Sequence, residues 1–269
     1  MNSIQSKPTV EAPLYISTDD ELEIFEAAYF GGLPIMLQGP TGCGKTRFVE
    51  HMAHRLGVPL FTISCHEDMT ASDLLGRYVL TDGSTEWVDG PLTRAVREGG
   101  ICYLDEIVEA RQDATVAIHS LTDHRRELYL ERRGGEKLCA ADGFGLVVSY
   151  NPGYQSVLKD LKMSTRQRMV AIELGFPGPE VEERILIGSG INPEAASALV
   201  RLGVAIRRTS QSGLREVAST RTLISAGKLM IKGLSFKSAS LAAIAGPLTD
   251  DVELRAGLLA LINAYDPSI

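Results

Sequence analysis

The sequence predicts an α/β protein, with a five-stranded parallel sheet in a phosphate-loop domain and a small all-helical domain at the C-terminal end. Short apolar runs alternate with helical patterns as far as residue 176, and a glycine-rich loop separates one such run from a helix. After residue 176 only helical spacing remains. Strands that alternate with helices are typical of parallel sheets, because each parallel pair needs a crossover connection. The expected strands are residues 34–38, 60–64, 101–106, 144–150 and 169–174.

The glycine-rich loop matches the complete pattern G-x-x-x-x-G-K-S/T. Glycines let the backbone curl so that successive N–H groups point at phosphate oxygens, and the helix at 47–56 adds its positive N-terminal end. Lysine in this pattern reaches the β- and γ-phosphates, and the final hydroxyl binds Mg²⁺. A chance match in a turn is the alternative, and the flanking strand and helix argue against it. The candidate nucleotide-binding residues are Gly39, Pro40, Thr41, Gly42, Cys43, Gly44, Lys45 and Thr46.

The apolar run at 101–106 ends in two acids, Asp105 and Glu106. In a phosphate-loop protein this is a Walker B strand, in which Asp105 holds Mg²⁺ and Glu106 activates the attacking water. The alternative is an acidic pair at a helix N-terminus, where carboxylates are also favoured. The intact loop upstream supports the catalytic interpretation.

The next strand ends at Asn151-Pro152-Gly153. An asparagine at this strand end can hydrogen-bond both the γ-phosphate and the attacking water, whereas the alternative is a plain turn. Arg221 stands in the first turn of a predicted helix, which is unfavourable for a cation, so a nucleotide-facing role is favoured over a surface one.

A basic cluster precedes the fifth strand. One interpretation is a solvated helix face, and the other is an arginine finger that neutralises transition-state charge on a neighbouring subunit's nucleotide. The cluster comprises Lys159, Lys162, Arg166 and Arg168.

Composition narrows the functional classes. The chain has 269 residues, 44% apolar and 23% charged, with a net charge of −7 and a pI near 5.3. The acidic balance argues against a broad nucleic-acid footprint. No apolar stretch has transmembrane or signal-peptide character, so we expect a cytoplasmic protein without membrane contact. The five histidines form no convincing metal-ligand spacing, and four separated cysteines without a C-x-x-C pair suggest buried free thiols: Cys43, Cys65, Cys102 and Cys139.

The remaining elements follow from caps, turns and helical spacing. We expect a loose arm at 1–13, then a helix from an N-cap at Thr18 to Gly31-Gly32. Two hairpin signals, near 77–88 and 127–139, interrupt the α/β pattern as inserts in a domain spanning 14–176. Helices are expected at 70–75, 91–98 and 111–124, and in the C-terminal domain of 177–269 at 180–187, 192–208, 219–233, 235–245 and 249–264.

Together these motifs resemble an AAA+ ATPase, and the two hairpins resemble the inserts of its MoxR branch. Within that branch the chain is similar to the CbbQ/NirQ/NorQ group over nearly its whole length. The stretches that carry this resemblance are 39–50, Cys65-His66-Glu67-Asp68, Thr70-Ala71-Ser72-Asp73-Leu74, 149–156 and Ser164-Thr165-Arg166-Gln167-Arg168.

The resemblance implies a role for each matching position. Lys45 and Thr46 match the Walker A ligands of ATP and Mg²⁺, and Asp105 and Glu106 match Walker B. Asn151 matches sensor 1 and Arg221 matches sensor 2. The arginine finger falls just before the fifth strand, with Arg168 as first choice and Arg166 as second.

The resemblance also implies a ring, most simply a hexamer, because a finger supplied in trans requires a neighbour. Such rings remodel a client enzyme. The client expected here is Rubisco, freed of inhibitory sugar phosphates together with a CbbO-like von Willebrand A-domain adaptor. NirQ/NorQ-type maturation of nitric oxide or nitrite reductase is the alternative. A nucleotide-gated binding switch without motor activity is the rival from another class, and a DNA-acting ATPase is disfavoured by the acidic charge. By analogy the two hairpins face the substrate or partner.

Overall fold

The computed structural model describes residues 12–267 except 82, 152–160 and 210–216. Most of the expected N-terminal arm lies outside the described residues. Pro152, Gly153 and Lys159 also lie outside them.

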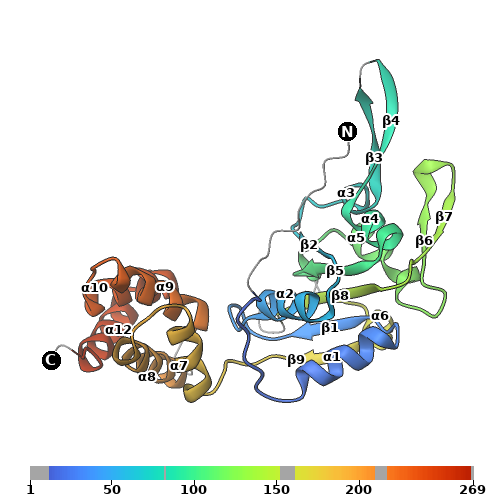
Figure 1. The fold of residues 1–269 in the computed structure, drawn as a ribbon. Coiled ribbons are helices and arrows are strands. Elements are labelled where there is room, and N and C mark those ends of the chain that lie inside the picture. The colour runs from blue at the N-terminus through green and yellow to red at the C-terminus, as the bar shows by residue number, and fades with distance from the viewer. Residues whose placement is uncertain (1–11, 82, 152–160, 210–216, 268–269) are drawn as a thin grey trace, which may run out of the picture.

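A five-stranded parallel sheet forms the centre of the first unit, as predicted (Figure 1). Its strands run in the order β2-β5-β8-β1-β9, so β8 is central and lies between β5 and β1. The register pairs Ile35 with Val147 and Leu60 with Ile101. Since the strands are parallel, all five carboxyl ends meet at one edge. The bounds are β1 (Ile35–Gln38), β2 (Leu60–Ser64), β5 (Gly100–Asp105), β8 (Phe144–Tyr150) and β9 (Val170–Glu173).

Helices cover both faces of the sheet, each over its own apolar core. Alternate residues of a strand point to opposite faces, so Ile35 and Leu37 join one core and Met36 the other. One face packs against α1 (Glu21–Phe30) and α2 (Lys45–Leu56). The opposite face packs against α3 (Ala71–Leu75), α4 (Pro91–Glu98) and α5 (Gln112–Ala117).

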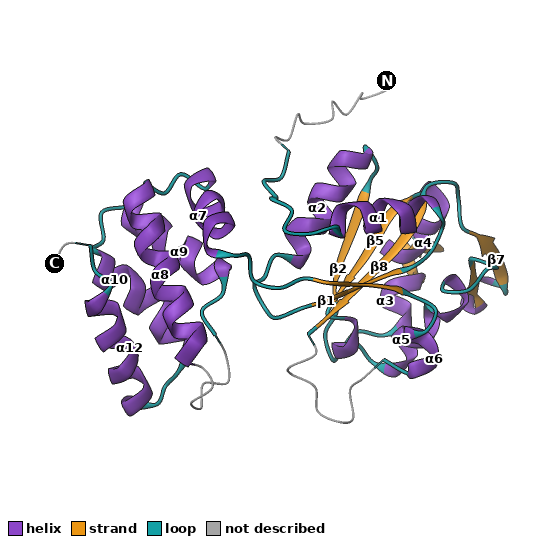
Figure 2. Ribbon diagram, turned by 90° about the horizontal axis from the view of Figure 1, so that it is seen from below, coloured by secondary structure: helices purple, strands orange, loops and turns teal. Residues whose placement is uncertain are grey.

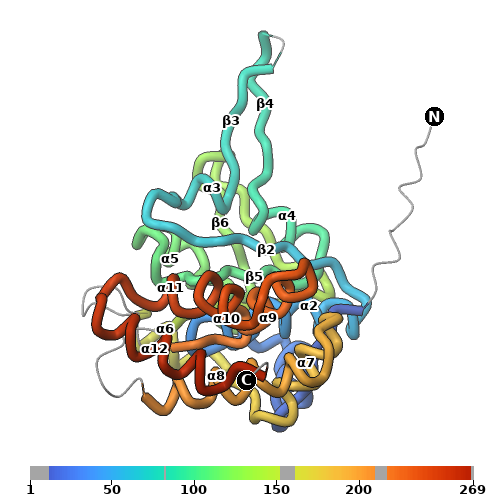
Figure 3. The backbone as a smooth tube through the Cα atoms, turned by 90° about the vertical axis from the view of Figure 1, so that its left-hand side faces the viewer, coloured from blue at the N-terminus to red at the C-terminus, as the bar shows by residue number. Residues whose placement is uncertain are grey.

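Two β-hairpins project from the sheet unit, as predicted (Figure 1), and the hairpin of residues 76–89 stands well clear of the rest of the molecule (Figure 3). An ion-pair network joins the base of the first hairpin to the turn end of the second. Arg97 in α4 contacts Asp89 at the end of one hairpin (Nε–Oδ2 2.8 Å) and Glu136 of the other (Nη2–Oε1 2.8 Å). Arg133 also pairs with Glu136 at 3.0 Å. The hairpins are β3 (Gly76–Thr81) with β4 (Ser84–Asp89), and β6 (Glu127–Leu130) with β7 (Glu136–Cys139); a 3₁₀ turn, Glu131–Arg133, lies between β6 and β7.

The C-terminal unit is all helical in its described residues and stands beside the sheet unit (Figure 2). Its core is separate and is built from leucine, isoleucine and alanine side chains. Asn192 caps its longest helix, where Asn192 Oδ1 accepts from the N–H of Ala195 at 2.8 Å. The helices are α7 (Pro179–Gly188), α8 (Pro193–Thr209), α9 (Thr220–Ile231), α10 (Phe236–Ser240) running into a π-helical turn (Leu241–Ala245) and α11 (Gly246–Leu248), and α12 (Val252–Ala264).

Three predicted helix bounds were wrong. The first helix begins at Glu21 rather than after Thr18, because the Glu21 carboxylate accepts the N–H groups of Thr18 and Asp19 and bends the chain there. The last helix begins at Val252 instead of 249, because Asp251 is its N-cap.

The helix expected at 111–124 ends at Ala117. A 3₁₀ turn, His119–Leu121, follows it, and the tighter i→i+3 bonds bring both Ile118 and Leu121 into the core.

The short α6 (Met163–Arg166) precedes β9. Among the described residues, no helix is both long and apolar enough to cross a membrane.

Candidate functional site

The glycine-rich loop connects the carboxyl end of β1 to the N-terminus of α2, where a phosphate-binding loop must lie. Gly42 and Gly44 adopt φ values of +75° and +108°, which non-glycine residues rarely adopt. The Lys45 side chain folds over the loop, and its Nζ donates to the carbonyl oxygens of Gly39 (2.7 Å) and Pro40 (3.2 Å). An ammonium has three N–H donors, so a phosphate oxygen can take the third.

Asp105 ends β5 within reach of the loop. Its Oδ2 accepts from the Thr46 hydroxyl at 3.2 Å, and its Oδ1 accepts from the buried Ser149 hydroxyl at 2.6 Å. The Tyr103 hydroxyl lies 2.7 Å from the same Oδ1. Ser149 and Tyr103 therefore fix the orientation of the carboxylate from the neighbouring strand and from its own strand.

These residues fit a Mg²⁺ ion bound with a nucleotide. Adjacent ligands of octahedral Mg²⁺ lie about 3 Å apart, because each metal–oxygen bond is about 2.1 Å. The 3.2 Å between Thr46 Oγ1 and Asp105 Oδ2 matches that spacing. The described residues contain no cluster of three or more His, Cys, Asp or Glu side chains, so the remaining ligands would be phosphate oxygens and water.

Glu106 and Asn151 lie at the same edge of the sheet. Glu106 follows β5 rather than ending it, and its left-handed backbone (φ 56°) lets its N–H donate to Ser149 Oγ at 3.1 Å. Its side chain is exposed. Asn151 follows β8, and its Nδ2 donates to Thr41 Oγ1 of the loop at 2.8 Å. The structure thus brings together both Walker B acids, the loop and the asparagine.

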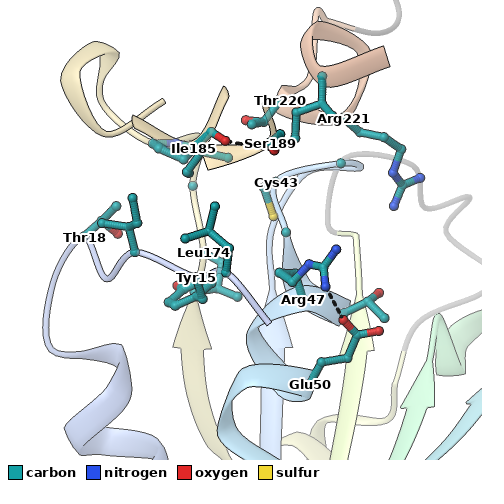
Figure 4. A pocket seen from close by; sticks show the side chains of 18 of the residues that line it. Tyr15, Thr18, Cys43, Arg47, Glu50, Leu174, Ile185, Ser189, Thr220 and Arg221 are labelled. Carbon is teal, nitrogen blue, oxygen red and sulfur yellow. Dashed lines mark hydrogen bonds and ion pairs between the residues drawn. The ribbon is translucent and has the colours of Figure 1, made fainter. Parts of the chain in front are cut away.

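A cavity of about 390 Å³ lies beside the loop, between the sheet unit and the helical unit (Figure 4). Gly42, Cys43, Gly44 and Thr46 line one side of it. The opposite side is formed by α7 and α9, from which Thr220 and Arg221 line the cavity. Residues 14–18 supply a largely apolar wall through Leu14, Tyr15, Ile16 and Thr18, and the remaining cations are Arg47, paired with Glu50, and Lys228.

The first turn of α9 rests directly on the loop. A Cβ added at Gly42 would lie 2.5 Å from Ser219 Oγ and 3.4 Å from Arg221 Cβ. Ser219 is the N-cap of α9, so the positive end of this helix points toward the loop. Arg221, which the sequence predicts to face the nucleotide, is exposed and lines the cavity.

Arg166 and Arg168 lie away from that cavity. The Arg166 guanidinium stacks over the Tyr150 ring at 5.6 Å, and Arg168 is exposed, with Nη1 3.5 Å from the carbonyl oxygen of His119. Thr165 is buried and its hydroxyl lies 3.1 Å from His119 Nε2. Neither arginine is among the residues that line that cavity.

The thiols and phenol at the site are held neutral. Burial raises the pKa of Cys43, against the lowering effect of Lys45. Burial, followed by the charges of Asp105 and Glu106, raises the pKa of Cys65 to about 12. Burial also raises the pKa of Tyr103, so its hydroxyl stays protonated and can donate to Asp105.

Sequence reasoning missed Ser149, Tyr103, Ser219 and the wall at 14–18 as parts of the site. A serine within an otherwise apolar central strand, two residues before Asn151, was a usable signal for Ser149. The wall carries no comparable pattern, because its residues are ordinary apolar side chains placed by the tertiary fold.

Comparisons with known proteins agree with this geometry. Residues 34–169 match the model of an AAA domain of the dynein-related subfamily, and residues 182–265 match the CbbQ/NirQ/NorQ C-terminal model. The denitrification regulatory protein NirQ of Pseudomonas aeruginosa is 56% identical over 94% of this chain and 97% of its own length. Protein NorQ of Paracoccus denitrificans is 54% identical over 97% and 96%.

Two further comparisons extend these results. Protein CbbQ of Hydrogenophilus thermoluteolus is 53% identical over 92% of this chain and 93% of its own length. Among solved structures, a RuvB mutant from Thermotoga maritima aligns with a TM-score of 0.54 over 93% of this chain and 71% of that one, at 15% identity. At that identity the match supports the fold alone.

Proposed function

The chain belongs to the CbbQ/NirQ/NorQ family of AAA+ ATPases, and from that premise we propose that it is a ring-forming motor that hydrolyses ATP to remodel a client enzyme. In this proposal residues 14–176 form the ATPase domain, and residues 177–269 form a lid that moves against it.

One observation carries the proposal: groups from three separate parts of the chain converge on the phosphate loop. Asp105 bonds Thr46, Asn151 bonds Thr41, and α9 rests on Gly42. A protein that only binds ATP needs the loop and the cavity, but it does not need the Glu106 carboxylate and the Asn151 amide beside the phosphates. Hydrolysis needs both.

Each residue then has a task in hydrolysis. Lys45 and the loop N–H groups bind the phosphates, while Thr46 and Asp105 would hold Mg²⁺, which would supply neutralisation of phosphate charge. Asn151 and Glu106 orient a water molecule. Glu106 accepts its proton as the water oxygen bonds to the γ-phosphorus, and the bond to the β–γ bridging oxygen breaks to give ADP and phosphate.

We assign the remaining charge neutralisation to a neighbouring subunit. Arg168 is exposed and lies outside its own chain's nucleotide cavity, which suits a finger that completes the site of the next subunit. Arg166, stacked on Tyr150, is the second choice. In a closed ring, most simply a hexamer, every nucleotide site receives an arginine from the neighbouring subunit.

Two clients fit this motor. The sequence resemblance favours Rubisco, released from inhibitory sugar phosphates with a CbbO-like adaptor. The name of the 56% identical relative, a denitrification regulatory protein, favours nitric oxide or nitrite reductase instead.

The two hairpins are the proposed contact surface for client or adaptor. Tyr78 and Leu80 of the first hairpin are 52% and 75% exposed, and the ion pairs of Arg97 join its base to the second hairpin.

The test is ATP hydrolysis by the purified protein, followed by client assays in parallel. One assay measures recovery of sugar-phosphate-inhibited Rubisco with a CbbO-like adaptor, and the other measures activation of nitric oxide reductase produced without its maturation factors. ATP-dependent recovery in one assay identifies the client. Binding of ATP without hydrolysis, in the presence of every partner, would instead support a nucleotide-gated switch.

A further inference from the structure

A buried ion pair locks two helices of the C-terminal unit together. Glu182 of α7 is 0% exposed, and Arg207 in the last turn of α8 binds it with both terminal nitrogens, Nη1–Oε2 at 2.9 Å and Nη2–Oε1 at 2.6 Å. Two parallel bonds between a planar guanidinium and a carboxylate fix direction as well as distance. The pair therefore sets how α7 and α8 are placed against each other.

The same two side chains hold the residues that lead into α9. Arg207 Nε donates to the carbonyl oxygen of Ala218 at 2.7 Å, and the Thr220 hydroxyl donates to Glu182 Oε1 at 2.6 Å. Thr220 is the first residue of α9 and directly precedes Arg221. The point at which the Arg221 side chain is attached to α9 therefore depends on the Glu182–Arg207 pair.

A third contact reaches the segment between β9 and α7. The Arg207 guanidinium lies 4.4 Å from the centroid of the Phe176 ring, a stacking distance. The Arg207 side chain therefore contacts three parts of the chain. These are Phe176 in the connection between the two units, Glu182 in α7, and Ala218 just before α9.

Stability alone does not explain this arrangement. The cost of removing two charges from water offsets most of their attraction, so an apolar pair of similar volume would fill the space as well. An apolar pair would not supply the bonds to Ala218 and Thr220. What the ions add is a fixed geometry at the start of α9.

We propose that Glu182 and Arg207 are positioning residues for the nucleotide site, which aim Arg221 at the bound nucleotide. This inference rests on the proposed function, because it assumes that Arg221 contacts ATP. The pair itself touches no nucleotide and acts only through the first turn of α9.

The test is a double-mutant cycle. Arg207→Lys keeps the positive charge but loses the two parallel hydrogen bonds of the guanidinium. Thr220→Val keeps the side-chain shape but loses the hydrogen bond to Glu182. Each variant is made alone and together with Arg221→Ala. Arg208→Lys, at the exposed neighbouring position, is the matched control. Affinity for a fluorescent ATP analogue, the hydrolysis rate and the melting temperature are measured for every protein.

We expect both variants to weaken ATP binding, Arg207→Lys by about tenfold, and to have almost no further effect when Arg221 is already alanine. Arg208→Lys should match the unchanged protein. Equal losses of ATP affinity with and without the Arg221 side chain would overturn the inference, since the pair would then act on stability or on another part of the site.

Thr220→Val leaves the ion pair intact, so it decides the question if Arg207→Lys fails to fold. Failure of the two proposals is also distinguishable. If the unchanged protein binds no ATP analogue, the proposed function fails and the inference falls with it. If the unchanged protein binds and hydrolyses ATP but the losses are independent of Arg221, only the inference fails.

Discussion

The hydroxyl of Ser149 donates a 2.6 Å hydrogen bond to Asp105 Oδ1, which links the central strand β8 to the carboxylate that ends β5. Ser149 Oγ also accepts from the N–H of Glu106 at 3.1 Å. One buried hydroxyl thus orients the proposed metal ligand and the backbone of the proposed catalytic base.

Ser149→Ala should therefore raise the Mg²⁺ concentration needed for half-maximal hydrolysis by about tenfold, because a hydrogen bond to a metal-binding carboxylate holds that carboxylate in the orientation the metal needs. It should also lower the free energy of unfolding by about 1–2 kcal/mol, since the Glu106 N–H loses its partner. Mg²⁺ titration of the ATPase and urea unfolding measure the two effects. Ser64→Ala, at an exposed strand end, is the control. A stability loss with an unchanged Mg²⁺ requirement would reduce Ser149 to a structural residue.

Glu106→Gln should reduce turnover by about 10²–10⁴-fold while ATP affinity is retained, because the amide fills the same space but cannot take the proton. Single-turnover hydrolysis and equilibrium nucleotide binding separate the two effects. Glu109→Gln, three residues further on, is the matched control and should behave as the unchanged protein. Normal turnover by Glu106→Gln would remove Glu106 from the mechanism.

Arg168→Ala should keep nucleotide binding but lose assembly-dependent hydrolysis by about 10³-fold, the scale of an arginine finger. Mixing it with Lys45→Ala subunits should restore part of the activity, since each supplies what the other lacks at a shared interface. Light scattering first establishes that the two variants assemble together. Mixed assemblies without any recovered activity would refute the in-trans role of Arg168, and the same experiment with Arg166→Ala tests the second choice.

Arg97→Ala should loosen both hairpins at once, because Arg97 joins Asp89 of one to Glu136 of the other. Amide hydrogen exchange should become faster in 76–89 and 127–139. The melting temperature should fall by no more than about 3 °C, because partly exposed ion pairs contribute little to stability. Arg94→Ala, on the same helix but paired with Glu98, is the control. Faster exchange in one hairpin alone would contradict the coupling.

His119 should make stability depend on pH. Burial, and then the charges of Lys162 and Arg168, lower its pKa in the folded protein. The unfolded chain then binds a proton more readily than the folded protein, so His119 costs stability as the pH falls below about 6.5 and has no such effect above it. Urea unfolding at pH 7.5 and 5.5 should show a smaller acid loss for His119→Gln than for the unchanged protein. His124→Gln, at an exposed position, should lose as much as the unchanged protein. Equal acid losses in all three proteins would refute the prediction.

Local sequence signals predicted most of the fold and the first layer of the site. The phosphate loop, the acids at the end of β5 and the asparagine after β8 each lie at the end of an apolar strand, and parallel strands bring their carboxyl ends to one edge. The hairpins were visible from their turn residues.

The supporting contacts could not be read in this way, because they join residues far apart in the chain. Ser149 lies 44 residues from Asp105, and Thr220 lies 38 residues from Glu182. Glu21 shows that the partner of a hydrogen bond can be missed even when the two residues are close in the sequence. Its carboxylate accepts the N–H groups of Thr18 and Asp19, and the helix begins at Glu21 and not directly after Thr18. A hydrogen-bond partner is chosen by the packed structure, not by the residue type alone.

The distribution of the thiols has a practical consequence. Cys43, Cys65 and Cys102 are buried, and burial raises the pKa of each, so few thiolates form there near neutral pH. The expectation of a buried thiol was wrong for Cys139, which is exposed at the end of β7 because that strand lies in a hairpin outside the central sheet. A maleimide dye should therefore label the natural chain at the second hairpin, with no engineered cysteine, and its fluorescence would report in real time when a client docks.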